Sequence, residues 1–463
     1  MHAARLNSPR PESDGRQPTR KCFRRSAPLL ALALAVLAIA PAAVVSAETI
    51  DDSMNWALRS SFSVQADNER QIATEERLRG SVDAFMPSIA WIHERILSSR
   101  INYTPDYAVP DTNGLNTVPT QEPNVSGFQA VLPLFDGFRR YNNFRSARLG
   151  VEAGRYLQLD KRQQTYLDAA TAYLAVIRDR KLIALRKRQV SDIGQIAERT
   201  KVRLSTQDAT QTDVEIARSR LIAAEAAVEQ AAAELQTSEI EYARITGARP
   251  GDMPAPRVPT ELLPANVGEL RQALVTSNPK LAAARLGAVA AGYEANAKLA
   301  DVLPQVNLVA SSIEQSNISA ALYKFRDNTV KVQMRVPLYE PGAFPRINEA
   351  AALARQRSWE TADIQKQDIA AATSLYVRHQ ATIELIGRAN ARVKTMQRAV
   401  EGYRIEGAAG FHTVVDTLNA QNELTEAETV RTNLEFTRDA EVFAIAASLA
   451  RLGPAPTQVS ALR

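Results

Sequence analysis

The sequence contains few of the side chains that build disulfides, metal sites and catalytic centres. Its 463 residues include one cysteine, Cys22, and four histidines. A single cysteine cannot form an internal disulfide, and His93, His379 and His412 are far apart in the chain. The sequence therefore indicates neither a cysteine–histidine metal site nor a nucleophile–base pair. We expect no catalytic residues, no metal and no cofactor, and hence no enzyme.

Long apolar runs are missing after residue 47, which excludes a transmembrane helix of about 20 residues there. The apolar run Ala27 to Ala40 follows several Arg and Lys residues and precedes the small residues Val45 to Ala47. This pattern predicts a secretory signal peptide over residues 1–47. An exported chain without apolar helices is either soluble or enters an outer membrane as β-strands.

An excess of charge of one sign is also missing once the predicted signal peptide is set aside. Of the 56 basic and 51 acidic residues, 7 and 2 fall in residues 1–47, which leaves 49 of each sign. The formal charge of +5 thus belongs to the signal peptide, and we expect no nucleic-acid partner. Cys22 would leave with the same segment.

What the sequence does contain is an internal duplication with a period of about 200 residues. Leu132–Asp136 recurs as Val336–Glu340, and Thr212–Val214 recurs in pattern as Val415–Thr417. We predict a first repeat over residues 48–247, a connector with five prolines over 248–266, a second repeat over 267–453 and a tail over 454–463. This period is far longer than that of a solenoid repeat.

Each predicted repeat combines a strand pair with long helices. The expected strands are 88–103 and 125–135 in the first copy and 304–317 and 328–340 in the second. The expected helices are 51–85, the two long ones 139–204 and 346–406, and the shorter ones 213–246 and 416–452. Leu221, Val228, Leu235 and Tyr242 lie seven residues apart, which is typical of a coiled coil.

The last predicted strand alternates most clearly. Val330, Val332 and Met334 are separated by the polar residues Lys331 and Gln333. A barrel strand with lipid on one side and water on the other has this pattern, and so does an ordinary half-buried sheet. In the first strand, the polar residues His93 to Arg95 are expected near its start, below the membrane.

Taken together, the ordered motifs resemble the TolC family of outer-membrane channel proteins. The resemblance rests on the joints at Pro87 and Pro304, the turns Leu132–Gly137 and Val336–Gly342, Arg203 with Thr212 and Asp213, Ser277–Leu281, and Gly410–Gln421. It implies a mainly α fold with a β-barrel part. Three copies would form one twelve-stranded outer-membrane barrel and a long periplasmic α-helical barrel.

The resemblance also implies a function and partners. A TolC-like protein is a passive, porin-like channel that exports toxic compounds or proteins together with an inner-membrane transporter and a periplasmic adaptor. The stretch from Tyr403 to Leu424 is most similar to the type I secretion branch. The alternative is a periplasmic coiled-coil scaffold or adaptor that does not enter a membrane.

The same resemblance places the periplasmic constriction at Asp213 and Asp416, with Thr212, Arg203, His412 and Asn419 beside them. His412 stands where the family usually has Arg, and Asn419 where a second Asp is common, so we expect a thinner acidic ring. Arg203 is a candidate partner for a closed-state ion pair, or a surface cation near a helix end. Thr210 with Asp213, and Thr413 with Asp416, also fit plain helix-capping boxes. The tip turns Ser205–Gln211 and Gly407–Phe411, with Gly407, Ala408, Ala409 and Gly410, are the expected adaptor contact.

Overall fold

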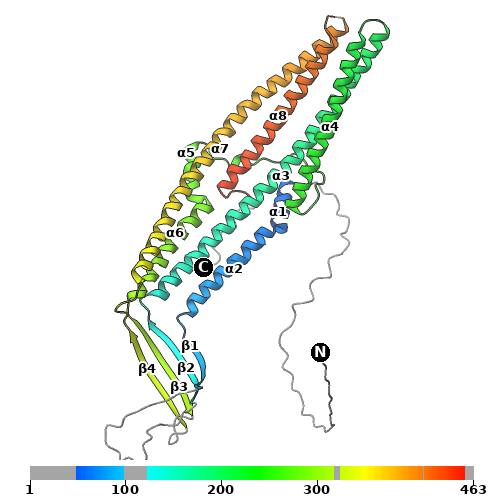
Figure 1. The fold of residues 1–463 in the computed structure, drawn as a ribbon. Coiled ribbons are helices and arrows are strands. Elements are labelled where there is room, and N and C mark those ends of the chain that lie inside the picture. Colours follow the sequence, from blue (N-terminus) through cyan, green and yellow to red (C-terminus); the bar gives the residue numbers. More distant parts are fainter. Residues whose placement is uncertain (1–47, 98–122, 317–323, 410, 454–463) are drawn as a thin grey trace, which may run out of the picture. The chain divides into compact units, whose positions relative to one another are not determined.

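Two similar series of elements follow one another along the chain, as the duplication predicts. The computed structural model describes residues 48–97, 123–316, 324–409 and 411–453 (Figure 1). The first series is α1 (Ile50–Ser60), α2 (Phe62–Asp83), β1 (Ser88–Arg95), β2 (Asn124–Phe135), α3 (Arg139–Ser205) and α4 (Gln211–Thr246). The second is η1 (Thr260–Leu262), α5 (Val267–Ser277), α6 (Pro279–Lys298), η2 (Leu299–Val302), β3 (Gln305–Ser316), β4 (Lys324–Arg335), α7 (Ala343–Ala408) and α8 (Val414–Ser448). The predicted signal peptide, the predicted tail and the predicted strand ends at 98–103 and 317 lie outside the described residues.

The long helices α3 and α7 have 67 and 66 residues, so each spans about 100 Å. The predictions of long helices over 139–204 and 346–406 are confirmed. Helix α7 begins three residues earlier than predicted because Pro345 lies in its first turn, where a missing N–H breaks no helical hydrogen bond. Each long helix packs along a shorter helix: α3 along α4, and α7 along α8 (Figure 1).

Three details of the predicted helices are wrong. The expected helix 51–85 is two helices, because Ser61 has extended backbone and its Oγ accepts from the N–H of Val64 to start α2. Helix α2 then ends at Asp83 rather than at Phe85. Helix α8 ends at Ser448 rather than at 452. There the chain turns towards α3, where the Gln163 side chain donates to Leu452 O at 2.9 Å and accepts from Leu452 N at 3.0 Å.

The predicted heptad positions make up half of the α4 seam, which is the face of α4 that packs against the neighbouring helices. Tyr242 is fully buried, whereas Leu221, Val228 and Leu235 are half-buried. The other half of the seam is alanine: Ala217, Ala224 and Ala231 are buried, also at a spacing of seven. Ala217 and Ala224 pack with Ile193 of α3 and Leu418 of α8. Small side chains thus bring three helices close together near the tips.

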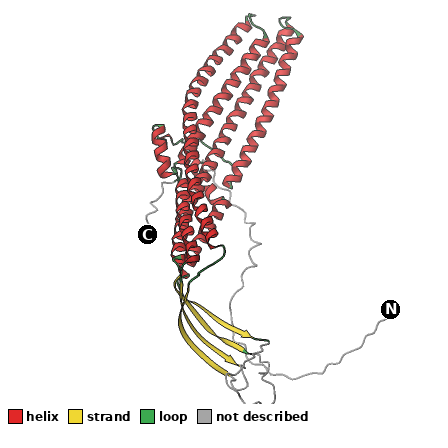
Figure 2. Ribbon diagram, turned by 60° about the vertical axis from the view of Figure 1, so that its left-hand side comes forward, coloured by secondary structure: helices red, strands yellow, loops and turns green. Residues whose placement is uncertain are grey.

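The four strands form one antiparallel sheet in the order β1-β2-β3-β4, at one end of the helices (Figure 2). Strand β4 ends at Arg335, not at the predicted residue 340, because Pro337 has no N–H for a ladder bond. In β2 the equivalent Pro133 is accommodated at a shift of register before Phe135. His93 to Arg95 lie at the end of β1 farthest from the helices, since Arg95 pairs with Asn124 and Ser88 with Val131. They therefore lie away from the helices rather than at the start of the strand, where they were expected.

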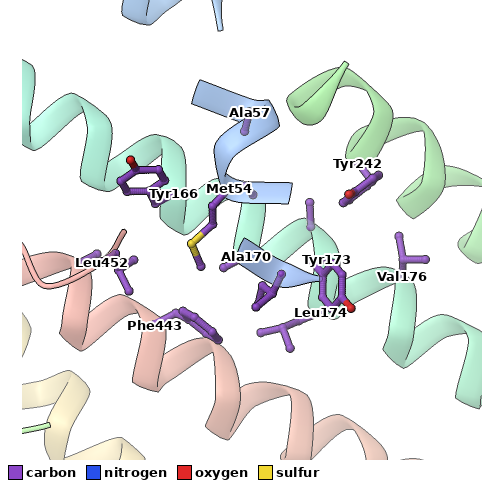
Figure 3. Close-up of a cluster of buried hydrophobic side chains, with 14 of the residues drawn as sticks. Met54, Ala57, Tyr166, Ala170, Tyr173, Leu174, Val176, Tyr242, Phe443 and Leu452 are labelled. Atoms are coloured by element: carbon purple, nitrogen blue, oxygen red, sulfur yellow. The ribbon is translucent and has the colours of Figure 1, made fainter. Parts of the chain in front are cut away.

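The main core joins α1, α3, α4, α8 and the connector. Met54, Tyr173, Tyr242 and Phe443 meet there (Figure 3), and the buried Met253 of the connector belongs to the same cluster. The predicted connector is therefore anchored rather than lying freely on the surface. The described part of the chain contains no helix that combines the length and apolar character needed to cross a membrane.

Equivalent tyrosines of the two copies hold the connector. The Tyr173 hydroxyl lies 2.7 Å from Pro254 O and 3.0 Å from Glu48 O. Tyr376, its counterpart in α7, donates to Pro264 O at 3.1 Å. Burial raises the pKa of Tyr173 to about 12, so its hydroxyl stays a neutral donor at physiological pH.

Both strand-to-helix joints meet at one carboxylate. Asp301 in η2 accepts from Arg139 of α3 at 2.8 Å and from Arg346 of α7 at 3.3 Å. Beside it, Gly137 has a φ of +67°, and a Cβ there would lie 2.8 Å from the Leu303 Cβ. The first residues of the two long helices are therefore fixed relative to each other.

We predict that Asp301→Asn lowers the free energy of unfolding by about 1–3 kcal/mol, because two guanidinium groups lose a partly buried carboxylate partner. Thermal unfolding of the purified protein, followed by its helical circular dichroism, measures this. Glu76→Gln is the matched control, since Glu76 pairs with Arg79 on an exposed helix face, where such pairs contribute little. Equal melting of both variants would show that the Asp301 cluster is not a stabilising joint.

Candidate functional site at the tips of the long helices

The two tips are linked by Arg203, at the C-terminal end of α3. Its Nη2 donates to Asp208 O at 3.2 Å within its own tip, and its Nη1 donates to Gly407 O of the other tip at 3.4 Å. Within one described chain Arg203 bonds these carbonyls rather than Asp213, and its closed-state ion pair stays a prediction. The reason is that free carbonyls at helix C-termini accept hydrogen bonds from nearby arginine side chains.

Asp213 and Asp416 both act as capping residues. In the first tip, Asp213 Oδ2 accepts from Thr210 N at 2.9 Å and from Thr210 Oγ1 at 2.7 Å. In the second tip, Asp416 Oδ2 accepts from Thr413 N at 3.0 Å and from Thr413 Oγ1 at 2.7 Å. The capping-box interpretation of both motifs is thus confirmed.

These hydrogen bonds keep both carboxylates ionised. The backbone N–H of Thr210, then its hydroxyl, lowers the pKa of Asp213, and the Arg203 charge adds a smaller effect. The Thr413 hydroxyl, then its backbone N–H, lowers the pKa of Asp416, with a smaller effect from His412. Capping therefore leaves a negative charge at the start of each shorter helix, where the helix dipole also favours it.

His412 lies between two carboxylates. Its Nε2 is 2.8 Å from Glu406 Oε2, and its Nδ1 is 4.0 Å from Asp416 Oδ2. The ring also meets the edge of the Tyr403 ring, with centroids 4.8 Å apart. Sequence reasoning missed Glu406, because the turn between α7 and α8 brings it to His412 and no helical periodicity relates the two.

A cleft of about 810 Å³ lies between α3, α7 and α8 beside this cluster. Arg203, Tyr403, His412 and Gln421 are among its lining residues. Gln421 Nε2 donates to Asp192 Oδ2 at 2.8 Å, which ties α8 to α3 across the cleft. The cleft thus lies between the two hairpins of one chain, and both polar and apolar side chains line it.

The structure brings only some of the predicted residues together. Arg203, Gly407 and His412 line the cleft, and Asp416 lies next to His412. Thr212 and Asn419 are exposed and do not line it, and Asp213 belongs to the other tip. Gly410 and the side chain of Ala408 lie outside the description. Among the described residues, no three His, Cys, Asp or Glu side chains form a group that could hold a metal ion.

Comparison with known proteins agrees with this architecture. Residues 270–451 match the model of the family described as "Outer membrane efflux protein". The chain is 28% identical over 300 residues to the outer membrane efflux protein BepC of Brucella suis biovar 1 (strain 1330), covering 64% of this chain and 66% of BepC. It is 31% identical over 188 residues to the proteases secretion protein PrtF of Dickeya chrysanthemi, covering 36% and 40%. The matched regions thus span just under two thirds of the first relative and less of the second.

The fold is also that of a solved channel structure. The open state of the Neisseria gonorrhoeae MtrE outer membrane channel superposes with a TM-score of 0.70 at 15% identity, covering 88% of this chain and 90% of that one. The similarity in fold thus extends well beyond the second repeat. The chain therefore has the TolC-like fold of these channels, and its residues 270–451 match the outer membrane efflux protein family.

Proposed function

We propose that the protein is the outer-membrane duct of an export system. Three copies would close a twelve-stranded barrel in the membrane, and their helices would form a tunnel through the periplasm. The observation that carries this proposal is the four-stranded sheet, with its two open edges and its two chemically different faces. A duct of this kind performs no chemistry, and its energy comes from a partner.

We expect other copies of the chain to pair with the two open edges of the sheet. Among the described residues, β1 and β4 each pair with one neighbour only. Unpaired backbone N–H and C=O groups cannot remain in hydrocarbon, so a membrane sheet has to close. Joining β4 of one copy to β1 of the next would satisfy both edges and place twelve strands in a ring.

The faces of the sheet support insertion into lipid. Val330, Val332 and Met334 are 74%, 65% and 62% exposed, and the register aligns them with Ala310, Leu308 and Val306 of β3. The opposite face of β4 carries Lys331 and Arg335. A water-soluble scaffold would leave this apolar face in water, which proteins generally avoid. The sheet therefore favours the channel over the periplasmic scaffold.

The tips are the proposed entrance. Asp213 and Asp416 do not bond to each other within one chain, so a ring of acids would require the equivalent residues of other copies. We propose that Asp416 lines the periplasmic constriction, with Asp213, Thr212, Arg203, His412 and Asn419 near it. A ring of carboxylates would attract cations and repel anions.

The partners follow from the same arrangement. An inner-membrane transporter and a periplasmic adaptor would meet the tips at Gly407, Ala408, Ala409 and Gly410, the end farthest from the sheet. The name of BepC indicates efflux, and that of PrtF indicates protease secretion, so the cargo is either toxic compounds or proteins. Deleting the gene and measuring both toxic-compound sensitivity and the secreted proteome separates the two.

We predict that Met334→Arg reduces the amount of assembled trimer in the outer-membrane fraction. A charge on the lipid face near mid-membrane costs about 2–4 kcal/mol. Lys331→Glu, on the opposite face, should leave assembly intact and change the ion selectivity of the channel. Heat-modifiable migration of the membrane fraction measures assembly. A protein found only in the periplasmic fraction would refute the duct, and equal assembly of both variants would refute the assignment of faces.

We predict that trivalent cations block the channel weakly, more strongly after Asn419→Asp, and not at all after Asp416→Asn. The measurement is the conductance of the trimer in a planar bilayer, with the cation added on the periplasmic side. Because the pKa of Asp416 is lowered, its charge should persist as the pH falls and disappear only below the usual value of 3.8. The stabilising effect of this cap is likewise present above that value and lost as the pH falls below it. Asp208→Asn, in the other tip turn, is the control.

We predict that Ala409→Trp abolishes export without lowering the amount of trimer, because a bulky side chain at this exposed tip position would block the adaptor. Ala409→Ser keeps the side chain small and should preserve export. Export is measured with the cargo identified by the deletion strain, and trimer by gel migration. Normal export by the Trp variant would place the adaptor elsewhere.

A further inference from the structure

The outward face of the sheet changes from apolar to basic towards the end farthest from the helices. The register aligns Trp91, Phe128, Ser312 and Asn328 in one row. The next row on the same face contains His93, Ser126, Glu314 and Arg326, and the last contains Arg95, Asn124, Ser316 and Lys324. We call His93, Arg95, Glu314, Lys324 and Arg326 the basic rim.

Side-chain contacts confirm that these residues share a face. The His93 ring stacks on that of Trp91, with centroids 5.4 Å apart and planes inclined by 2°. Glu314 accepts from Lys324 at 2.7 Å and from Arg326 at 3.1 Å. The acids Glu94 and Asp327 stand at alternate strand positions, so they lie on the opposite, inward face.

Charge is thus segregated across the thickness of the sheet. The outward face of the rim carries three permanent cations and one carboxylate in each copy, whereas the inward face at the same level carries two carboxylates. Glu314 uses only part of the donor capacity of its partners, because a guanidinium has five N–H groups and an ammonium three. The remaining donors can bind a further anion.

The height of the rim matches a membrane boundary. From Met334 to Arg326 the strand rises about 27 Å, which corresponds to roughly 20 Å along the membrane normal at a tilt of about 40°. The apolar band of such barrels is about 25 Å tall and bordered by aromatic residues. Trp91 and Phe128, 61% and 62% exposed, occupy that border position just below the basic rim.

We propose that the basic rim binds the phosphate groups of lipid headgroups in the outer leaflet. The proposal rests on the proposed function, since it requires the sheet to span the membrane with its helices in the periplasm. Arginine and lysine form charge-assisted hydrogen bonds with phosphate, and arginine can do so with two N–H groups at once. When β4 meets β1 of the next copy, Lys324 and Arg326 come beside His93 and Arg95 of that copy, and the rim becomes a continuous girdle.

The test measures lipid retention by the purified full-length trimer in a neutral detergent. Phosphatidylglycerol, phosphatidylcholine or inorganic phosphate is titrated, and bound lipid is counted by native mass spectrometry alongside the melting temperature. The variant is Lys324→Gln with Arg326→Gln. We expect its affinity for phosphatidylglycerol to fall by about tenfold or more, because each basic residue near an anionic surface contributes to binding. Lys324→Arg with Arg326→Lys, which keeps both charges, should retain the affinity.

Lys331→Gln with Arg335→Gln is the matched control, since it removes two cations from the inward face of the same strand. An equal loss in this control, or no loss in the rim variant, would overturn the proposal while leaving the channel intact. Equal stabilisation by inorganic phosphate would assign the site to a soluble anion and overturn it as well. A wild-type chain that forms no trimer in the outer membrane would overturn the duct and the lipid site together.

Discussion

The architecture depends on how little of the surface of each long helix one chain can bury. A helix of about 100 Å extends beyond any single core, and towards the tips α3 and α4 bury mainly the seam that they share with α8. Alanine makes this seam close: Ala217, Ala224 and Ala231 allow the helices to approach where larger residues would separate them. The rest of the helical surface still exposes apolar side chains such as Ile222, Ile240 and Trp359, which helices of neighbouring copies would cover.

Residues of the two repeats align the two hairpins with each other. Corresponding residues of the two copies, Tyr173 and Tyr376, hold the same connector by its carbonyl groups. Arg139 and Arg346 begin the two long helices and share the carboxylate of Asp301. At the other end, Arg203 joins the two tips. Each hairpin is thus fixed near the sheet, at the connector and at the tip, which is where a duct would need to transmit or resist movement.

The sheet and the tips differ in how much of their role one chain can fulfil. A single sheet already separates an apolar face from a polar one, and it already separates basic from acidic residues at its far end. A single pair of tips, in contrast, places Asp213 and Asp416 in separate caps. The proposed membrane insertion and lipid binding would therefore be properties of each copy, whereas the proposed constriction would arise only from assembly.

The sequence by itself determined the order of the main elements and the length of the two long helices. An unbroken run of helix-forming residues without proline predicts α3, the Thr-x-x-Asp motifs predict both caps, and the alternation of Val330, Val332 and Met334 predicts the faces of β4. Only the tertiary structure decided which side chains meet across the repeats. Arg203 bonds carbonyl groups rather than Asp213, His412 finds Glu406 across a turn, and Asp301 receives arginines from two helices more than 200 residues apart. Periodicity describes neighbours along one element, but these contacts depend on the distances between elements, which packing alone sets.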